Sequence, residues 1–273
     1  MTPLVEVDGQ KCRGCGLCVR DCPYAALVQE SKGKPPRFLE DVGCLRCGHC
    51  VSVCPTGALS HAELNAEDFV PVEPSVDDDT MQKFLSSKRS VRHFLSQPVE
   101  RQALDRLLRV ASQAPSDGNS QDREFVILDD KEAIQKIESA VLDGFRAFVA
   151  LMKTKGMPET SKEMKRSRAI LDAFDKGGHP IFRGAPCVVF GCAPQKDVFS
   201  WYNVCVAMDY LMLQAHAMGL GSCIVGMCLY DPPRLGKMLN LPEGHQVYSA
   251  VVLGWPAFTH RRTVSRKKPL VLK

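Results

Sequence analysis

The chain has 273 residues, enough for one large domain or two unequal ones, and its hydrophobic content of 45% supports a buried core. The formal net charge is +4 and 24% of the residues are charged, a balance that does not indicate nucleic-acid binding. Because the sequence contains no run of about 18 apolar residues, we expect no helix that spans a membrane.

Cysteine is the residue type that stands out, with thirteen in the chain and eight of them within the first 54 positions. The first residues, MTPLVEVDGQK, lack the charged and apolar regions of a secretory signal. We therefore expect a cytoplasmic protein, in whose reducing surroundings clustered cysteines more often bind metal than form disulfides. The other five cysteines stand among apolar neighbours, and we interpret them as small buried hydrophobic residues.

The eight N-terminal cysteines form two copies of one motif, C-x2-C-x2-C-x3-C-P, set 32 residues apart. The stretches CRGCGLCVRDCP and CLRCGHCVSVCP show the internal repeat directly. The cysteines of the two copies are Cys12, Cys15, Cys18 and Cys22, and Cys44, Cys47, Cys50 and Cys54.

This spacing suits a [4Fe–4S] cube, whose four iron corners each take one thiolate. Three closely spaced cysteines wrap a tight loop over three corners, and in this motif the fourth cysteine ligates the other cluster. The spacing thus predicts two clusters with crossed ligands: Cys12, Cys15, Cys18 and Cys54 for the first, and Cys44, Cys47, Cys50 and Cys22 for the second.

A zinc site and a disulfide knot are the alternatives. Tetrahedral zinc commonly uses two separated pairs of ligands and gives no role to a third evenly spaced cysteine. Residues 3–62 resemble the bacterial two-[4Fe–4S] ferredoxins, with all eight ligand positions present. The resemblance implies a small ferredoxin-like domain, residues 1–62, that transfers single electrons at low potential.

The cysteine-rich segment is followed by an acidic one. Residues 63–79 carry seven acidic side chains, two prolines (Pro71 and Pro74) and no apolar periodicity. We interpret them as an extended linker. The remaining residues, 80–273, are enough for a full second domain.

In this second domain, helical and strand patterns alternate. Residues 100–115 place five apolar side chains on one helical face and end at a proline. The further elements expected are a strand at 124–130, a helix at 131–153, a looser charged segment to residue 180, a strand at 185–193, a long helix at 199–219, a strand at 222–226, a short helix at 233–239 and a strand at 246–255. The order predicts a layered α+β domain.

Two features bear on nucleotide binding. The glycines of GLGSCIVG, residues 219–226, miss the G-x-G-x-x-G spacing and lead from a helix into a strand, so we expect no Rossmann-type site. By contrast, Arg89, Ser90 and Arg92 offer two guanidinium groups and a hydroxyl within four positions, which suits a phosphate monoester. Arg266 could supply another positive charge.

Four stretches together resemble the FMN-dependent nitroreductase family: SKRSVRHF (87–94), ASQAPSDGNSQDREFVIL (111–128), AHAMGLGSCIVG (215–226) and LGWPAFTHRRTVSRKKP (253–269). The resemblance implies a mixed sheet flanked by helices and an interlocked homodimer that buries two FMN molecules at its interface. The family's Asn-x-Gln-Pro-Trp reads Asn-Ser-Gln-Asp-Arg here, so the flavin face near Asp122 and Arg123 departs from the family pattern.

The resemblance also implies which residues contact FMN. Some would surround the phosphate and ribityl chain, some the ribityl or ring side, and some would present backbone N–H groups to the ring. In that order they are Arg89, Ser90, Arg92 and Arg266; Ser116, Asn119 and Gln121; and Ile224, Val225 and Gly226. The histidines form no convincing acid–base pair, and we nominate no catalytic side chain.

An iron–sulfur domain joined to a flavin domain indicates an FMN-dependent reductase. Electrons from an external low-potential donor, such as reduced ferredoxin or NAD(P)H, would cross the clusters to FMN and reduce an electron-poor acceptor: a nitroaromatic, a quinone or an activated alkene. One alternative is an electron carrier or redox sensor that relays electrons to a partner protein without small-molecule turnover. Another is oxidative or dehalogenating flavin chemistry. The substrate lining would come from the weakly patterned residues 144–180, so the sequence names no substrate.

Overall fold

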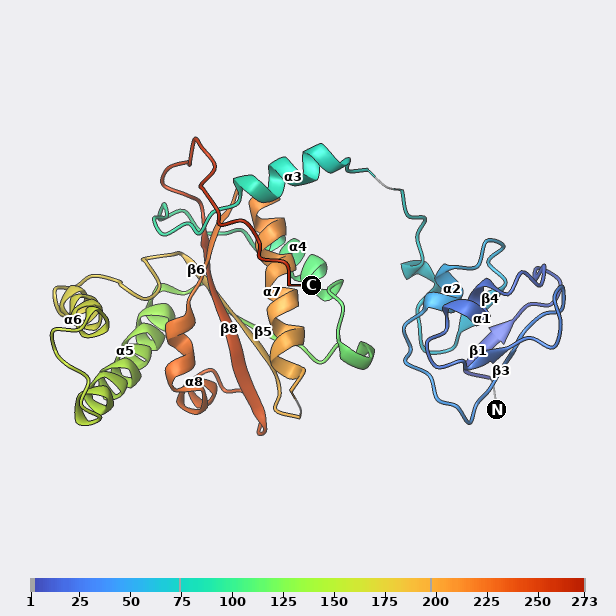
Figure 1. Ribbon diagram of the computed structural model, residues 1–273, viewed down its shortest axis with the longest axis horizontal. Helices are drawn as coiled ribbons and strands as arrows, with labels where there is room; N and C mark the ends of the chain where they lie inside the picture. Colours follow the sequence, from blue (N-terminus) through green and yellow to red (C-terminus); the bar gives the residue numbers. More distant parts are fainter. Residues whose placement is uncertain (1–2, 74, 197, 273) are drawn as a thin grey trace. The chain divides into compact units, whose positions relative to one another are not determined.

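The computed structural model describes residues 3–73, 75–196 and 198–272 (Figure 1). The chain divides into two compact units, a cysteine-rich unit formed mainly by residues 1–75 and a sheet unit formed mainly by residues 76–273. Pro74 of the expected linker lies outside the described residues. No described helix combines the length and the apolar composition needed to cross a bilayer.

The two halves of the cysteine-rich unit exchange strands. Strand β1 (Val5–Val7) pairs antiparallel with β4 (Leu59–His61), and β2 (Leu27–Val28) pairs antiparallel with β3 (Arg37–Phe38). Adding the repeat spacing of 32 residues moves β1 onto the position of β3, and β2 onto that of β4. Each half therefore pairs its first strand with the last strand of the other half.

The helices of this unit are one or two turns long and follow the cysteine loops. Helix α1 (Leu17–Asp21) starts after Gly16 and α2 (His49–Ser52) starts after Gly48, at φ angles of 71° and 73° that favour glycine. A further turn, η1, covers Ala66–Asp68. The buried core is small, with Val5, Cys18, Leu27, Ala58 and Leu59 at its centre. A core of this size usually needs a metal or a disulfide for stability.

The acidic run that the sequence assigns to the linker opens a helix instead. Helix α3 spans Asp78–Ser87, and the Asp77 carboxylate accepts a hydrogen bond from the backbone N–H of Thr80 at 2.9 Å. Asp78 and Asp79 lie in its first turn, where negative charge is favoured by the helix dipole. The linker expected through residue 79 therefore ends earlier than the acidic composition suggests.

The sheet unit is built on four strands in the order β5–β6–β8–β7, each paired antiparallel with its neighbour. They are β5 (Glu124–Leu128), β6 (Cys187–Pro194), β7 (Gly221–Ile224) and β8 (His245–Gly254). Within the described residues, a parallel pairing is added at the isolated bridge between Ser90 and Ser222. This bridge ties the segment after α3 to the β7 edge.

Helices cover both faces of this sheet, as the sequence predicts. Helices α4 (Arg101–Ser112) and α7 (Ser200–Ala217) lie on one side of β8, and α5 (Lys131–Thr154) and α8 (Pro232–Met238) lie on the other (Figure 1). Side chains of β6 alternate between the two cores: Val188 and Phe190 pack with α5, while Cys187 and Val189 pack with α4 and α7. The layered helix-and-sheet fold is confirmed.

The charged segment after α5 was the weakest part of the sequence pattern, and the looser structure expected there is wrong. Helix α6 spans Lys162–Asp175, with Ser161 as its N-cap accepting from the backbone N–H of Met164 at 3.2 Å. Met164 is buried, and Ile170 packs against the same small core beside α5. A good cap and a few contacts suffice for a helix whose exposed face is charged.

Gly191 of β6 lets α7 approach the sheet closely. A Cβ atom at this position would lie 2.5 Å from Val204 Cγ1 and 3.0 Å from Met208 Cγ, both on α7. We predict that Gly191→Ala lowers the free energy of unfolding of the sheet unit by about 1–3 kcal/mol, because α7 must move away from the strand. Urea unfolding followed by far-UV circular dichroism measures this loss.

Gly236→Ala is the matched control. Gly236 lies in α8, and an added Cβ would meet only an ordinary contact, 3.6 Å from Leu241 Cδ1. Because alanine favours the helix, this variant should be as stable as the parent or more stable. Equal destabilisation by both substitutions would contradict the proposed role of close packing at Gly191.

Candidate functional site

A cavity in the cysteine-rich unit is lined by cysteines from both halves of the repeat. Cys22 comes from the first half, and Cys44, Cys47 and Cys50 come from the second. The rest of the lining is mostly apolar and includes Val5, Pro23, Leu27, Phe38 and His61. These four cysteines are the set that the spacing assigns to the second cluster.

Cys18 of the first half lies near cysteines of both halves. Burial raises the pKa of the Cys18 thiol, and the nearby negative charges of Cys54 and Cys12 raise it further. Cys18 in turn contributes to the raised pKa of Cys50, so it lies near both Cys54 and Cys50. Within the described residues, no three His, Cys, Asp or Glu side chains converge as the ligands of one metal ion would. In a [4Fe–4S] cube each thiolate binds a different iron atom, so the four sulfur atoms need not converge on one point.

Backbone N–H groups point at four of the sulfur atoms. The donors and acceptors repeat with the 32-residue spacing, and each N···S distance is 3.3 or 3.4 Å. The pairs are Gly14 to Cys12, Arg46 to Cys44, Ala26 to Cys22 and Ala58 to Cys54. Such donors stabilise negative charge on sulfur, so the loops suit thiolates better than thiols.

The sheet unit contains a hollow of about 220 Å³ at the end of α3, where Lys88 and Arg89 meet the end of α7 and the returning C-terminal segment. Its lining includes Ser222 of β7 and Thr259 and His260 of that segment. The backbone N–H of Val91 donates to the Ser222 carbonyl at 3.0 Å, which fixes Lys88 and Arg89 at the hollow. Three parts of the chain that are distant in sequence thus form one site.

One of the cationic side chains at this hollow has a nitrogen without a hydrogen-bond acceptor among the described residues. Arg89 Nε is buried and, among the described residues, finds no hydrogen-bond partner, while Arg89 Nη1 donates to the Lys88 carbonyl. Burial lowers the pKa of Lys88, although the charge of Asp209 opposes this effect. A buried unpaired donor beside a second cation suits an anion such as a phosphate.

The sequence does not single out two further residues at this hollow, Lys88 and His216. The His216 ring lies 2.7 Å from Ser87 Oγ through Nε2, and burial lowers the pKa of His216, with the charge of Lys88 adding to the effect. Lys88 could have been noticed beside Arg89. His216 offers no local signal, because it is 129 residues from Ser87.

The other expected phosphate residues are more exposed. The Ser90 side chain is exposed beside its backbone bridge to Ser222. Arg92 is exposed and donates to the Ser90 carbonyl at 3.3 Å. Arg266 is exposed in the irregular C-terminal segment and does not line the hollow. The structure thus brings Arg89, but not Arg266, to the hollow's wall.

The expected ribityl and ring contacts come from two other segments. Ser116 Oγ accepts from the backbone N–H of Gln121 at 3.0 Å, and Asn119 and Gln121 have positive φ angles of 53° and 49°. Asn119 ends the short turn η2 (Asp117–Asn119). The loop therefore holds three polar side chains in a tight, left-handed backbone.

The ring-side segment begins where β7 ends. The Ile224 side chain is 58% exposed, whereas Val225 is buried and its N–H donates to the Ala250 carbonyl at 2.8 Å. Gly226 is exposed and begins the turn η3 (Gly226–Tyr230). The turn thus presents one exposed apolar side chain and a glycine at the sheet edge.

Arg123 replaces the family's Trp and has a structural role. Only 9% of Arg123 is exposed. Its Nη2 donates to the backbone carbonyls of Ser112 and Ala114, both at 2.6 Å. These carbonyls lie at and just beyond the end of α4, where unpaired acceptors need donors. Arg123 therefore supplies the donor for two carbonyls at the end of α4, while its Nε and Nη1 are buried without a partner among the described residues.

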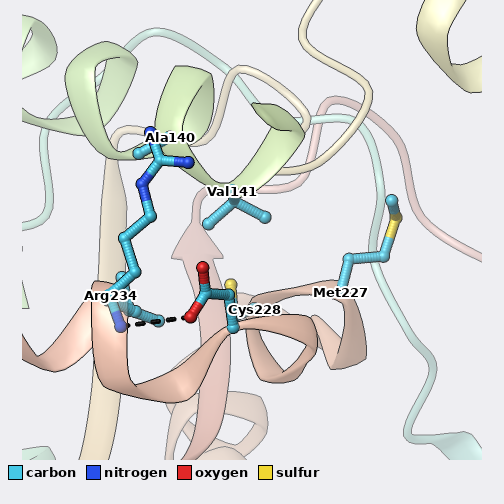
Figure 2. Close-up of a pocket in the computed structure, with 7 residues that line it drawn as sticks. Ala140, Val141, Met227, Cys228 and Arg234 are labelled. Atoms are coloured by element: carbon cyan, nitrogen blue, oxygen red, sulfur yellow. Dashed lines mark hydrogen bonds between the residues drawn. The ribbon is translucent and has the colours of Figure 1, made fainter. Parts of the chain in front are cut away.

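A smaller hollow lies between α5 and the turn into α8 (Figure 2). At about 10 Å³ it has room for roughly one water molecule. There the Asp231 carboxylate accepts a hydrogen bond from the backbone N–H of Arg234 at 3.2 Å. Burial raises the pKa of the Cys228 thiol in the same lining to about 12. A thiol that stays protonated is unreactive, so this hollow is a packing feature of the fold.

Residues 85–255 match the family model described as the nitroreductase family, and residues 11–58 match that of a 4Fe-4S dicluster domain. A 5,6-dimethylbenzimidazole synthase of Rhodospirillum rubrum is 27% identical over 197 residues, covering 67% of this chain and 84% of that protein. A chloronitrobenzene nitroreductase of Comamonas testosteroni is 26% identical over 217 residues, covering 68% and 88%.

The fold agrees with solved structures of this kind. The structure of a nitroreductase with bound FMN from Bacteroides fragilis has a TM-score of 0.56 at 19% identity, covering 72% of this chain and all of the other. The nitroreductase model spans more than half of the present chain. The chain therefore belongs to the nitroreductase family, and it carries a 4Fe-4S dicluster domain ahead of its nitroreductase domain.

Proposed function

We propose that this protein is an iron–sulfur flavoprotein reductase, which passes electrons from two [4Fe–4S] clusters to FMN and then to an electron-poor small molecule. The acceptor would be a nitroaromatic, a quinone or an activated alkene. The observation that carries the proposal is the joining in one chain of a dicluster domain at residues 11–58 to a nitroreductase domain at 85–255. A single-electron entry domain fused to an oxidoreductase domain implies transfer between them.

The two clusters would be held by crossed ligands. The cavity that joins Cys22 to Cys44, Cys47 and Cys50 supports this assignment for the second cluster. The proximity of both Cys54 and Cys12 to Cys18 is consistent with it for the first. Clusters of this kind require reduced thiols, which is consistent with a cytoplasmic location.

The hollow at the end of α3 would receive the FMN phosphate. Arg89 would satisfy its buried Nε with a phosphate oxygen, and Lys88 would add a second charge-assisted contact. Ser90 and Arg92 would complete the phosphate side, and the Ser116, Asn119 and Gln121 loop the ribityl side. Arg266, which does not line the hollow, would have no part in the phosphate site as the structure stands. The edge at Ile224, Val225 and Gly226 would border the ring. When bound, FMN would supply the change from single-electron to two-electron chemistry.

A second copy of the chain would complete the protein as a homodimer. The start of α7 exposes several apolar side chains, with Val198 70%, Trp201 53% and Tyr202 51% accessible. At the C-terminus, Leu270 and Leu272 are each 85% exposed. Apolar surface of this extent normally meets a partner, which supports the proposal of a dimer.

The competing proposal is an electron carrier or redox sensor that serves a partner protein. We would test both by preparing anaerobic protein reduced with dithionite, removing the dithionite and mixing it with a nitroaromatic, a quinone and an activated alkene in turn. The reductase predicts rapid flavin reoxidation and repeated turnover when reduced ferredoxin is supplied. Absence of turnover with every acceptor, despite full reduction, would favour the carrier.

A second anaerobic experiment tests which external electron donor reduces the flavin. Purified protein is mixed without oxygen with reduced ferredoxin or with NADPH, and the flavin absorbance is followed. We expect reduction through the clusters to be the faster route, because the dicluster domain accepts single electrons. Flavin bleaching by NADPH alone at catalytic rates would contradict a donor role for the clusters.

Arg89→Ala tests the phosphate site. We predict that it weakens FMN binding by roughly 10- to 100-fold, because a charge-assisted hydrogen bond contributes about 1.5–3 kcal/mol. Quenching of FMN fluorescence by flavin-free protein measures the affinity. Arg101→Ala is the control, since Arg101 is exposed and pairs with Asp105 on α4. An unchanged affinity in Arg89→Ala would remove Arg89 from the site.

Cys54→Ala tests the crossed ligands. We predict loss of one cluster, with iron falling from roughly eight to four atoms per chain, and alkylation of Cys12, Cys15 and Cys18 in the folded protein, mapped by mass spectrometry. Cys22→Ala is the matched control and should expose Cys44, Cys47 and Cys50 instead. Alkylation of the second-half cysteines in Cys54→Ala would show that each half holds its own cluster.

A further inference from the structure

His61 places an imidazole beside the cysteines of the second half. It is the last residue of β4, it is only 5% exposed, and it lines the same cavity as Cys22, Cys44, Cys47 and Cys50. Its Nε2 lies 3.7 Å from Cys44 Sγ, and the backbone N–H of Glu63 donates to its Nδ1 at 3.1 Å. The ring is therefore held from one side by the backbone and faces a sulfur atom on the other.

These two contacts decide where the ring proton lies. Nδ1 accepts the N–H of Glu63, so in the neutral ring the proton must be on Nε2. Nε2–H then donates to Cys44 Sγ, which also accepts from the N–H of Arg46 at 3.3 Å. The Cys44 sulfur thus has two N–H donors.

The first half of the repeat has no such donor at the equivalent position. Thirty-two residues before His61 stands Gln29, whose amide donates to the carbonyls of Gly14 at 2.9 Å and Lys34 at 2.5 Å. The equivalent of Cys44 is Cys12, which accepts the N–H of Gly14 at 3.4 Å. The internal repeat therefore provides its own comparison, and at this position only the second half has an imidazole donor to sulfur.

Two side-chain contacts on the other side must be weighed against this difference. The Arg13 side chain hydrogen-bonds to the sulfur of Cys15, and both residues are exposed. Thr56 Oγ1 lies 3.6 Å from Cys54 Sγ, and either atom could donate. Both contacts are exposed, so water competes with them, whereas His61 acts inside an apolar cavity where a hydrogen bond to a charged sulfur is stronger. The buried imidazole therefore stabilises its sulfur more than these exposed side chains do.

We propose that His61 holds the second cluster, that of Cys22, Cys44, Cys47 and Cys50, at a higher reduction potential than the first. Reduction adds negative charge to the cluster and its sulfurs, and an N–H donor stabilises the reduced form more than the oxidised one. An electron that enters the cysteine-rich unit would then settle on the second cluster. The inference rests on the proposed function, because it requires that both clusters are present.

The test is a redox titration of the full-length holoprotein, followed by electron paramagnetic resonance and compared between parent, His61→Leu and His61→Gln. We expect two one-electron steps in the parent. In both variants the step at the higher potential should shift downwards and the other should stay in place. His61→Gln keeps a polar side chain of the type found at Gln29, so a folding defect in His61→Leu would not decide the result.

His49→Leu is the matched control, because His49 lines the same cavity but places its Nδ1 3.7 Å from Asp21. It should leave both steps unchanged. Two unshifted potentials in a His61 variant that retains roughly eight iron atoms would overturn the role of His61 and leave the proposed function intact. Fewer iron atoms in the parent would overturn both.

Discussion

Neither half of the cysteine-rich unit completes its own sheet, because each half pairs its strands with those of the other. The strand pairs β1–β4 and β2–β3 each join one half to the other, and the cavity at Cys44 takes Cys22 from across the repeat. With a buried core as small as that around Leu27 and Leu59, this exchange of strands is the main constraint on the unit. The sulfur-directed N–H groups and the position of His61 depend on it.

In the sheet unit, segments that are distant in sequence form one hollow at the end of α3. Its sheet is apolar on both faces, so α4 and α7 on one face and α5 and α8 on the other fix the strand ends in space. The Ser90–Ser222 bridge then brings Arg89 to the end of α7. The result is a positively charged hollow with a buried guanidinium nitrogen that has no hydrogen-bond acceptor among the described residues.

Sequence reasoning succeeded where spacing carries the information. The cysteine repeat grouped Cys22 with three second-half cysteines that line one cavity with it, and the apolar face of α4 predicted its side of the sheet. It failed at α3 and α6, where caps at Asp77 and Ser161 outweigh a charged composition. It could not find His216 or His61, because each acquires its role from a partner brought close only by the fold.

The exchanged strands also bear on how the protein is made. On the proposed ligand scheme, each cluster needs a cysteine from both repeats, and the strand partner of the N-terminal β1 is β4 at Leu59–His61. A chain emerging from the ribosome could therefore neither finish a cluster nor close β1 into a sheet until about sixty residues had been released. Cluster insertion would follow the synthesis of both repeats, and truncation before β4 would leave β1 without its strand partner.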